Sequence, residues 1–405
     1  MEAAMANLLA VMLKALVKGK FKPGALTGLE RFMLAQLTLP DRVPTMLAAT
    51  NVEPSLIDPG IDYQMLSSSV ETNLELFGKI IERFPFDVVM VPCWLGLMLT
   101  GAAELGVKFQ IDKERVPYAY GHIIHNMEDV RRIQPFTQPG GYYGMALNIY
   151  REAQRRFPNT MITFPNDGPW DLAMLLRGDK QLPLDFKLYK DYTETQDPQR
   201  REKIRKFGDP ELWPAIMELT TQISIQIFKL AGEHGVSLMG ASMVDQFATK
   251  PVLSIEDFVQ YVLPYSEKAR AALGDKVAMA FMVTSPQELE QWLAHPALGK
   301  SLMMSGFTNY IFPNTPEGLT LPEYDEPMLA LSRKHKKTYS YMVHAKFIRD
   351  ASEARLEEVA RRICEMAVQS RTRMMVSVGA IGPGTDLKKI DLLLNTVHKY
   401  GRYAS

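Results

Sequence analysis

The chain has 405 residues, with 46 Lys and Arg against 46 Asp and Glu, a formal net charge of zero and 46% hydrophobic residues. A net basic surface is needed to neutralise phosphates, so this balance argues against a nucleic-acid partner. No run of residues approaches the roughly 20 uninterrupted apolar positions of a membrane span. Only Cys93 and Cys364 are present, which excludes a disulfide framework. Composition therefore indicates a globular protein with a large core.

Residues 1–27 predict an N-terminal helical arm, because the apolar residues between positions 5 and 17 recur three and four apart. Glu2 stands where a secretory signal would carry basic residues, and no cleavage site follows, so we expect a cytoplasmic protein. The arm is expected to pack on the rest of the chain or on a second subunit. The alternative is a membrane-surface helix, which three neighbouring lysines would favour.

Eight short β-rich runs alternate with helical stretches between residues 28 and 405. The runs are nearly continuously apolar, as expected of parallel strands covered on both faces. Eight such units predict an α/β fold, a (β/α)8 TIM barrel that forms a single domain, with long insertions after the second and third strands. The polar segment Asp179–Arg205 in the second insertion is expected to be a surface loop or lid. The predicted strands are Val43–Leu47, Asp87–Val91, Thr160–Phe164, Val236–Gly240, Val277–Val283, Ser301–Ser305, Thr338–Val343 and Met374–Val378.

Active sites of such barrels form where the strands end. Asp245 and His344 follow predicted strands and are the candidate catalytic acid–base residues, although either could instead cap or orient a neighbour. Cys93 is expected to line the pocket rather than act as a nucleophile, since no His or Lys adjoins it in sequence. The chain contains 24 methionines, and those near strand ends suit the wall of a flat apolar ligand site. The other predicted substrate-binding residues are Trp94, Asn166, Asp167, Trp170, Met239, Met243, Gln246, Met282, Asn309 and Tyr310.

Several short motifs, in order, resemble the uroporphyrinogen decarboxylase superfamily, which includes cofactor-free decarboxylases and cobalamin-linked methyltransferases. The resemblance runs from about residue 28 to residue 403 and implies the same barrel that the strand count predicts. The motifs are Glu30-Arg31-Phe32 with Pro40-Asp41-Arg42-Val43-Pro44, Phe86-Asp87-Val88-Val89, Gly168-Pro169-Trp170-Asp171-Leu172-Ala173, Asp245-Gln246-Phe247-Ala248 and Ile381-Gly382-Pro383-Gly384-Thr385.

The chain departs from two branches of that superfamily. The arginine-rich segment with which the decarboxylases hold substrate carboxylates corresponds here to Met46–Asn51, which has no arginine, and their essential Asp aligns with Cys93 or Trp94. A poly-anionic porphyrinogen would need several cations, so its decarboxylation is not expected. Lys276–Ser285 lacks the His-x-Cys of the zinc-dependent thiol methyltransferases, and Ala380 replaces their late Cys.

What the resemblance then implies is a methyltransferase that demethylates an apolar methoxylated aromatic compound and passes the methyl group to a separate corrinoid protein. The corrinoid must come from the partner, because the chain has no D-x-H-x-x-G cobalamin motif. Asp245 or His344 would protonate the leaving oxygen, while Asn166 and Asn309 would orient the small apolar substrate. A homodimer is the largest assembly that the resemblance suggests.

Three alternatives stay open at this point. A zinc site through Cys93, Asp245 and His344 would differ from the ligand set of the family. The chain could also be a cofactor-free decarboxylase or lyase acting on a small, weakly charged acid. Finally, it could be a non-catalytic binding barrel that keeps the pocket and has lost the catalytic residues.

Overall fold

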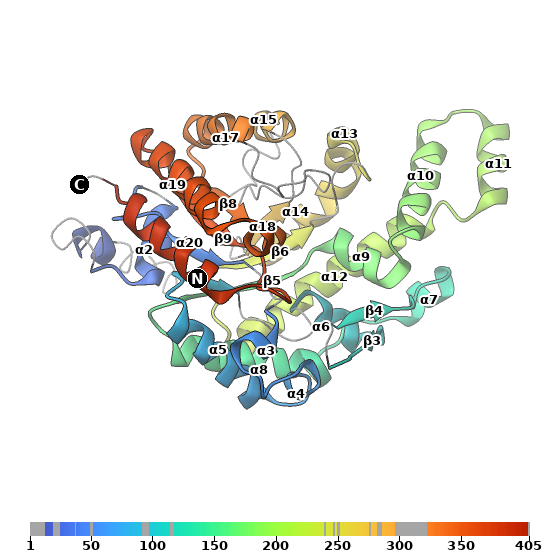
Figure 1. Ribbon diagram of the computed structural model, residues 1–405. Coiled ribbons are helices and arrows are strands. Elements are labelled where there is room, and N and C mark those ends of the chain that lie inside the picture. The colour runs from blue at the N-terminus through green and yellow to red at the C-terminus, as the bar shows by residue number, and fades with distance from the viewer. Residues whose placement is uncertain are drawn as a thin grey trace. The chain divides into compact units, whose positions relative to one another are not determined.

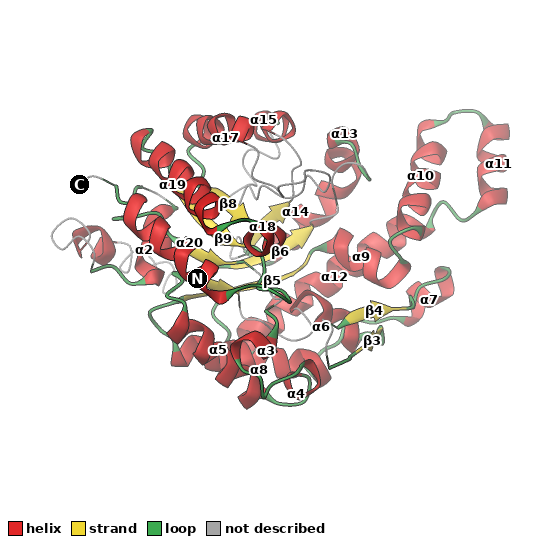
Figure 2. Ribbon diagram, in the orientation of Figure 1, coloured by secondary structure: helices red, strands yellow, loops and turns green. Residues whose placement is uncertain are grey.

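The computed structural model describes residues 13–18, 25–36, 38–48, 52–90, 97–113, 117–238, 240–245, 248, 252–274, 277–281, 286–295 and 322–403. Figures 1 and 2 show the helices and strands of the described residues. Residues 13–18 of the predicted arm are helical. Within these ranges, no helix is both long and apolar enough to cross a bilayer.

The chain divides into two compact units. The first comprises residues 1–94, 149–164 and 282–405, and the second comprises residues 95–148 and 165–281. Strand β5 (Met161–Asp167) passes from the first unit into the second.

The first unit contains a parallel sheet in the order β5-β2-β1-β9-β8. Its register pairs Met46 with Val88 on one side and with Ser377 on the other. This pairing confirms four predicted strands of the first unit within one or two residues at each end, and Met374–Val378 matches the prediction at both ends. The strands are β1 (Thr45–Leu47), β2 (Val88–Met90), β8 (Tyr339–Val343) and β9 (Met374–Val378).

In the second unit, the end of β5 is followed in the sheet by β6 (Ala241–Asp245) and β7 (Ala278–Phe281). The prediction of a strand at Val236–Gly240 is wrong, because β6 begins at Ala241, one residue after the predicted segment ends. Gly240 has a φ of 79° and ends a turn that precedes the strand. Strand β6 reads ASMVD and alternates in burial, so it lacks the apolar continuity that the prediction relied on. The predicted strand Ser301–Ser305 lies outside the described residues.

An antiparallel hairpin of β3 (Lys108–Gln110) and β4 (Tyr118–Tyr120), which the sequence did not predict, lies in the first insertion.

The helices of the second unit include α6 (Leu97–Glu104), α7 (Met127–Arg132), α9 (Pro169–Arg177), α12 (Leu212–Glu233), α13 (Ile255–Asp257), the π-helix η1 (Phe258–Val262) and α14 (Leu263–Ala272).

The second insertion is helical, so the prediction of a loop at Asp179–Arg205 is wrong. It forms α10 (Gln181–Glu194) and α11 (Pro198–Phe207), which extend beyond α9 and α12 (Figure 1). Lys, Gln, Arg and Glu are good helix formers, and few residues of these helices are buried. A strongly polar segment therefore gave no apolar periodicity by which to recognise the helices.

The first unit contains α2 (Gly28–Ala35), α3 (Pro54–Ile57), α4 (Tyr63–Leu66), α5 (Val70–Arg83), α15 (Pro286–Ala294), α17 (Pro322–His335), α18 (Ala345–Asp350), α19 (Glu353–Gln369) and α20 (Leu387–Tyr400). Helix α8 (Gly141–Arg156), like β5, runs from one unit into the other.

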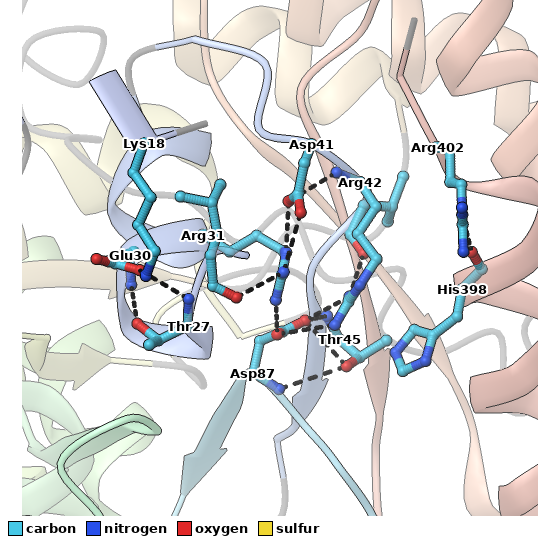
Figure 3. A network of polar contacts seen from close by, with 12 residues as sticks. Lys18, Thr27, Glu30, Arg31, Asp41, Arg42, Thr45, Asp87, His398 and Arg402 are labelled. Atoms are coloured by element: carbon cyan, nitrogen blue, oxygen red, sulfur yellow. Dashed lines mark hydrogen bonds and ion pairs between the residues drawn. The ribbon is translucent and has the colours of Figure 1, made fainter. Parts of the chain in front are cut away.

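A buried ionic network joins helix α2 to the starts of β1 and β2 in the first unit (Figure 3). Arg31 on α2 contacts the carboxylates of both Asp41 and Asp87, and Arg42 reaches Asp87 at 2.7 Å. The backbone amide of Thr45, the first residue of β1, donates to the same Asp87 carboxylate at 2.8 Å. This network lies at the amino-terminal ends of the strands, the end of a barrel at which residues contribute to stability rather than to catalysis. We therefore assign a structural role to the motifs at Glu30–Pro44 and Phe86–Val89.

Candidate functional site

Asp245 is the last residue of β6 and its side chain is held on three sides. One carboxylate oxygen, Oδ1, accepts hydrogen bonds from the backbone amides of Trp170 at 2.9 Å and Asp171 at 3.2 Å. The other, Oδ2, accepts a 2.8 Å bond from the hydroxyl of Ser266 on α14. Helix α9 receives no side-chain cap from its own N-cap residue, Gly168. A residue of the neighbouring strand therefore satisfies the free amides at the start of α9.

Gly168 is required at this point for space rather than for backbone conformation. Its φ of −77° is open to any residue. A Cβ atom built on Gly168, however, would lie 2.4 Å from the carboxyl atoms of Asp245. The glycine of the G-P-W motif thus allows the carboxylate to approach the helix closely.

Three acidic side chains are buried in this part of the second unit: Asp167, Asp171 and Asp245. Burial, together with the nearby charges of Asp171 and Asp245, raises the pKa of Asp167 well above its ordinary value. Burial also raises the pKa of Asp245 to about 6, against the hydrogen bonds from Ser266 and the two backbone amides, which favour its ionised form. Because Asp245 has these donors and Oδ2 of Asp167 has none among the described residues, the protonated form is favoured at Asp167 more than at Asp245.

Asp167 and its neighbour Asn166 also have unsatisfied polar atoms. Oδ2 of Asp167 and both amide atoms of Asn166 are buried and have no hydrogen-bond partner in the described part of the chain. Adjacent strand residues point to opposite faces of a sheet, and Oδ1 of Asn166 lies 3.9 Å from the Cβ position of Gly101 on α6. Asp167 and Asn166 therefore serve different faces of β5. The substrate-binding roles given to both remain predictions.

Trp170 and Met243 are both packed into the second unit. The Trp170 ring lies edge-on to Phe186 of α10, with centroids 6.1 Å apart. Met243 is 1% exposed and pairs in register with Met279 of the adjacent strand β7. Their local surroundings are those of core residues, and a pocket-lining role for either remains a prediction.

His344 lies in the first unit, apart in sequence from these residues, and caps helix α18. Its Nδ1 accepts a 3.2 Å hydrogen bond from the backbone amide of Lys346. Burial, with a smaller effect of the Lys346 charge, lowers the pKa of His344 below its ordinary value. The imidazole is thus neutral at pH 7, and since Nδ1 accepts, its proton is on Nε2.

The remaining candidates cannot be placed. Among the described residues, no three His, Cys, Asp or Glu side chains come together in the manner of a metal site. The alternative zinc set includes Cys93, which lies outside the described residues, so that set stays a prediction. The predicted site residues outside the described ranges are Cys93, Trp94, Met239, Gln246, Met282, Asn309 and Tyr310.

Sequence reasoning missed Ser266, Asp171 and the spatial role of Gly168. One local signal was available, because Gly168-Pro169 begins a helix without a capping side chain and so calls for an external acceptor. Nothing in the sequence indicated which residue would supply that acceptor, since Asp245 lies 75 positions away from Trp170.

The curated methylcobamide:CoM methyltransferase MtbA of Methanosarcina acetivorans is 21% identical over 211 residues, which cover 51% of this chain and 52% of that protein. The chain therefore matches about half the length of this relative. A solved structure, a methyltransferase from Methanosarcina mazei, superposes with a TM-score of 0.68 at 15% identity, covering 93% of this chain and 99% of the other. This likeness confirms the predicted TIM-barrel-like α/β fold.

The family model for uroporphyrinogen decarboxylase (URO-D) matches residues 33–297. The matched range contains the ionic network at Asp41 and Asp87 and the acidic cluster at Asp167 and Asp245. The resemblance carried by the sequence motifs is thereby confirmed, and the chain belongs to the uroporphyrinogen decarboxylase (URO-D) family.

Proposed function

We propose that this protein transfers a methyl group from a methoxylated aromatic compound to a corrinoid carried by a separate protein. The relationship to methyltransferases of the superfamily supports the reaction class. The observation that carries the proposal is the carboxyl group of Asp167 at the carboxyl end of β5, which is buried, has no hydrogen-bond partner for Oδ2 among the described residues, and has a pKa raised by burial and by the charges of Asp171 and Asp245. A neutral acid in an apolar setting suits the protonation of a leaving oxygen.

In this reaction the leaving oxygen keeps the electron pair of the broken bond and needs one proton. The bond between oxygen and the methyl carbon would break with its electron pair staying on oxygen, and a reduced corrinoid on the partner protein would supply the electron pair for the new bond to the methyl group. Asp167 donates its proton to the oxygen, so that the product leaves as a neutral alcohol or phenol. Asp245 remains ionised through its three hydrogen bonds, and its charge keeps the proton on Asp167 until the oxygen becomes basic.

His344 is the second candidate proton donor. Its neutral imidazole is fixed by the hydrogen bond to Nδ1, which leaves the Nε2 proton available for donation. His344 and Asp167 lie in different units. Separate substitution of each residue therefore shows which of the two donates the proton. Loss of activity in His344→Gln with full activity in Asp167→Asn would assign the proton to the histidine.

The test is methylation of a reduced corrinoid protein, followed by absorbance, with a panel of methoxylated aromatics. We expect the wild type to form the methylated corrinoid with at least one donor. Asp167→Asn keeps the size of the side chain and removes the acid, so we expect a loss of about 10²-fold or more in kcat. Asp167→Glu serves as the control that retains a carboxyl group. No methylation with any donor would contradict the proposal.

A second candidate is transfer of the methyl group from a methylated corrinoid to a thiol, which the name of the curated relative favours. The same assay tests it when the methylated corrinoid is supplied first and a thiol such as CoM is added. Against this direction stands the sequence Lys276–Ser285, which contains neither His nor Cys. Release of CO₂ from a small carboxylic acid without any corrinoid would instead support the decarboxylase alternative.

A further inference from the structure

We propose that helix α11 is a docking surface for an acidic face of the protein that carries the corrinoid. This inference rests on the proposed function, which requires a protein partner. Helix α11 contains five basic residues and one acidic residue over Pro198–Phe207, a net charge of +4 in a chain whose overall net charge is zero. The surface is defined here as Arg200, Lys203, Arg205, Lys206 and Phe207, all exposed.

Much of this charge is available to a partner. Within the described ranges, neither Arg200 nor Lys203 lies within 4 Å of an acidic side chain, and the Lys206–Glu202 pair is fully on the surface, where it contributes little. Next to these cations, the side chain of Phe207 is 84% exposed, the largest exposed fraction among the exposed hydrophobic residues of the described chain. An apolar anchor beside a charged rim is the usual composition of a protein interface.

The helix is held in one conformation. Asp197 caps its start by accepting from the amide of Gln199 at 2.9 Å. The guanidinium groups of Arg201 and Arg205 lie 5.4 and 5.0 Å from the centre of the Tyr192 ring on α10. Charges on a preordered helix bind without the entropic cost of first folding a segment.

Helix α10 fixes the base of this hairpin to the second unit. The ring of Tyr189 stacks on Trp213 of α12 at 4.9 Å, and Phe186 packs against both Trp213 and Tyr261. The ammonium group of Lys190 pairs with Asp257 at 2.5 Å. Because of these contacts, we interpret the α10–α11 hairpin as a fixed projection of the second unit rather than as a lid.

The same helices connect this surface to the candidate acid site. Helix α9 begins at the amides bound by Asp245, and Trp170 in its first turn packs on Phe186 of α10. At its other end, Arg177 pairs with Asp185 of α10 at 2.6 Å. A protein bound to α11 would therefore be held at a fixed position relative to Asp167 and Asp245, all within the second unit.

The observations favour a protein over a nucleic acid. A ten-residue helix is about 15 Å long and can meet few phosphates, whereas the chain as a whole has no net charge with which to hold a polyanion. An exposed phenyl ring such as that of Phe207 gains little from contact with a phosphate backbone, whereas it can pack on an apolar patch of an acidic protein surface.

The test compares two acceptors for the same methyl group, a cobalamin-loaded corrinoid protein and free cobalamin. The double variant Arg200→Glu and Lys203→Glu reverses two unpaired charges. We expect it to raise KM for the corrinoid protein about tenfold or more and to flatten the salt dependence of that KM, with unchanged transfer to free cobalamin. The matched control is Lys229→Glu with Arg361→Glu, which reverses two exposed charges on α12 and α19. An unchanged KM in the α11 variant would overturn the proposal.

Direct binding separates this inference from the proposed function. If the wild type methylates neither acceptor, the function fails, and docking is judged by calorimetry with the same corrinoid protein. Salt-sensitive binding that is lost in the α11 variant and kept in the control supports docking, and no binding by the wild type overturns it. Tighter binding of a 20-base-pair DNA duplex than of the corrinoid protein, abolished by the same variant, would also overturn it in favour of a nucleic-acid partner.

Discussion

Oδ1 of Asp245 accepts a 2.9 Å hydrogen bond from the backbone amide of Trp170, so that the last residue of one strand caps the helix that follows the neighbouring strand. This single contact couples the charge of Asp245 to the position of α9. Four predictions follow from the surroundings of these residues and from the ionic network of the first unit.

Substitution Gly168→Ala should destabilise the protein. The new methyl group would lie 2.4 Å from the Asp245 carboxyl, and either the carboxylate or the start of α9 must move. We expect a loss of about 1–3 kcal/mol in the free energy of unfolding, measured with urea. Gly382→Ala is the matched control, because nothing lies within 4 Å of its Cβ position. Equal stability of the two variants would contradict the close approach described here.

Removal of the Ser266 hydroxyl should raise the pKa of Asp245 above its value of about 6. The hydroxyl donates to Oδ2 at 2.8 Å and favours the ionised carboxylate. We expect Ser266→Ala to raise this pKa by about one unit, since a hydrogen bond to a charged group contributes about 1.5–3 kcal/mol. The measurement is the ¹³C chemical shift of labelled Asp carboxyls, with Asp245→Asn to identify the resonance. Ser266→Thr keeps a hydroxyl and should leave the pKa near its original value.

Asp87→Asn should be strongly destabilising. The carboxylate of Asp87 compensates the buried guanidinium group of Arg31 and the partly buried guanidinium group of Arg42. Removal of its charge leaves an excess of buried positive charge, for which we expect a loss of about 3–5 kcal/mol in denaturant unfolding. The comparison is Asp391→Asn, which breaks an exposed pair with Arg83 and should cost at most about 1 kcal/mol. Similar losses in both variants would show that the network is not a buried one.

Acidification should destabilise the protein through His398, which lies beside this network. Burial and the charge of Arg42 lower its pKa to about 4, whereas the unfolded chain titrates near 6.5. Between these values the unfolded state binds the extra proton, so the free energy of unfolding falls as the pH falls from 6.5 to 4. Relative to His398→Gln, we expect a loss of about 2–3 kcal/mol across this window. Unfolding curves at several pH values check it, and parallel curves for the two proteins would refute it.

The strands of the first unit could be predicted because their signal is local. Four runs of apolar residues were enough to locate β1, β2, β8 and β9, since strands buried on both faces are apolar throughout. The same criterion failed at β6, whose residues Ala241, Ser242 and Asp245 are small or charged. It failed also for α10 and α11, which are held by a few aromatic contacts at the base of the hairpin rather than by an apolar stripe of their own.

The sequence by itself determined the barrel-like α/β class and the family, because residue order and local periodicity encode these, whereas a catalytic role for Asp245 stays a prediction. Only the tertiary structure decided what Asp245 does. Its partners come from α9 and α14, separated from it by 75 and 21 positions, and no local pattern specifies such a meeting. The raised pKa of Asp167 likewise arises only in the tertiary structure, because burial and neighbouring charges exist only once the strands and helices have packed together.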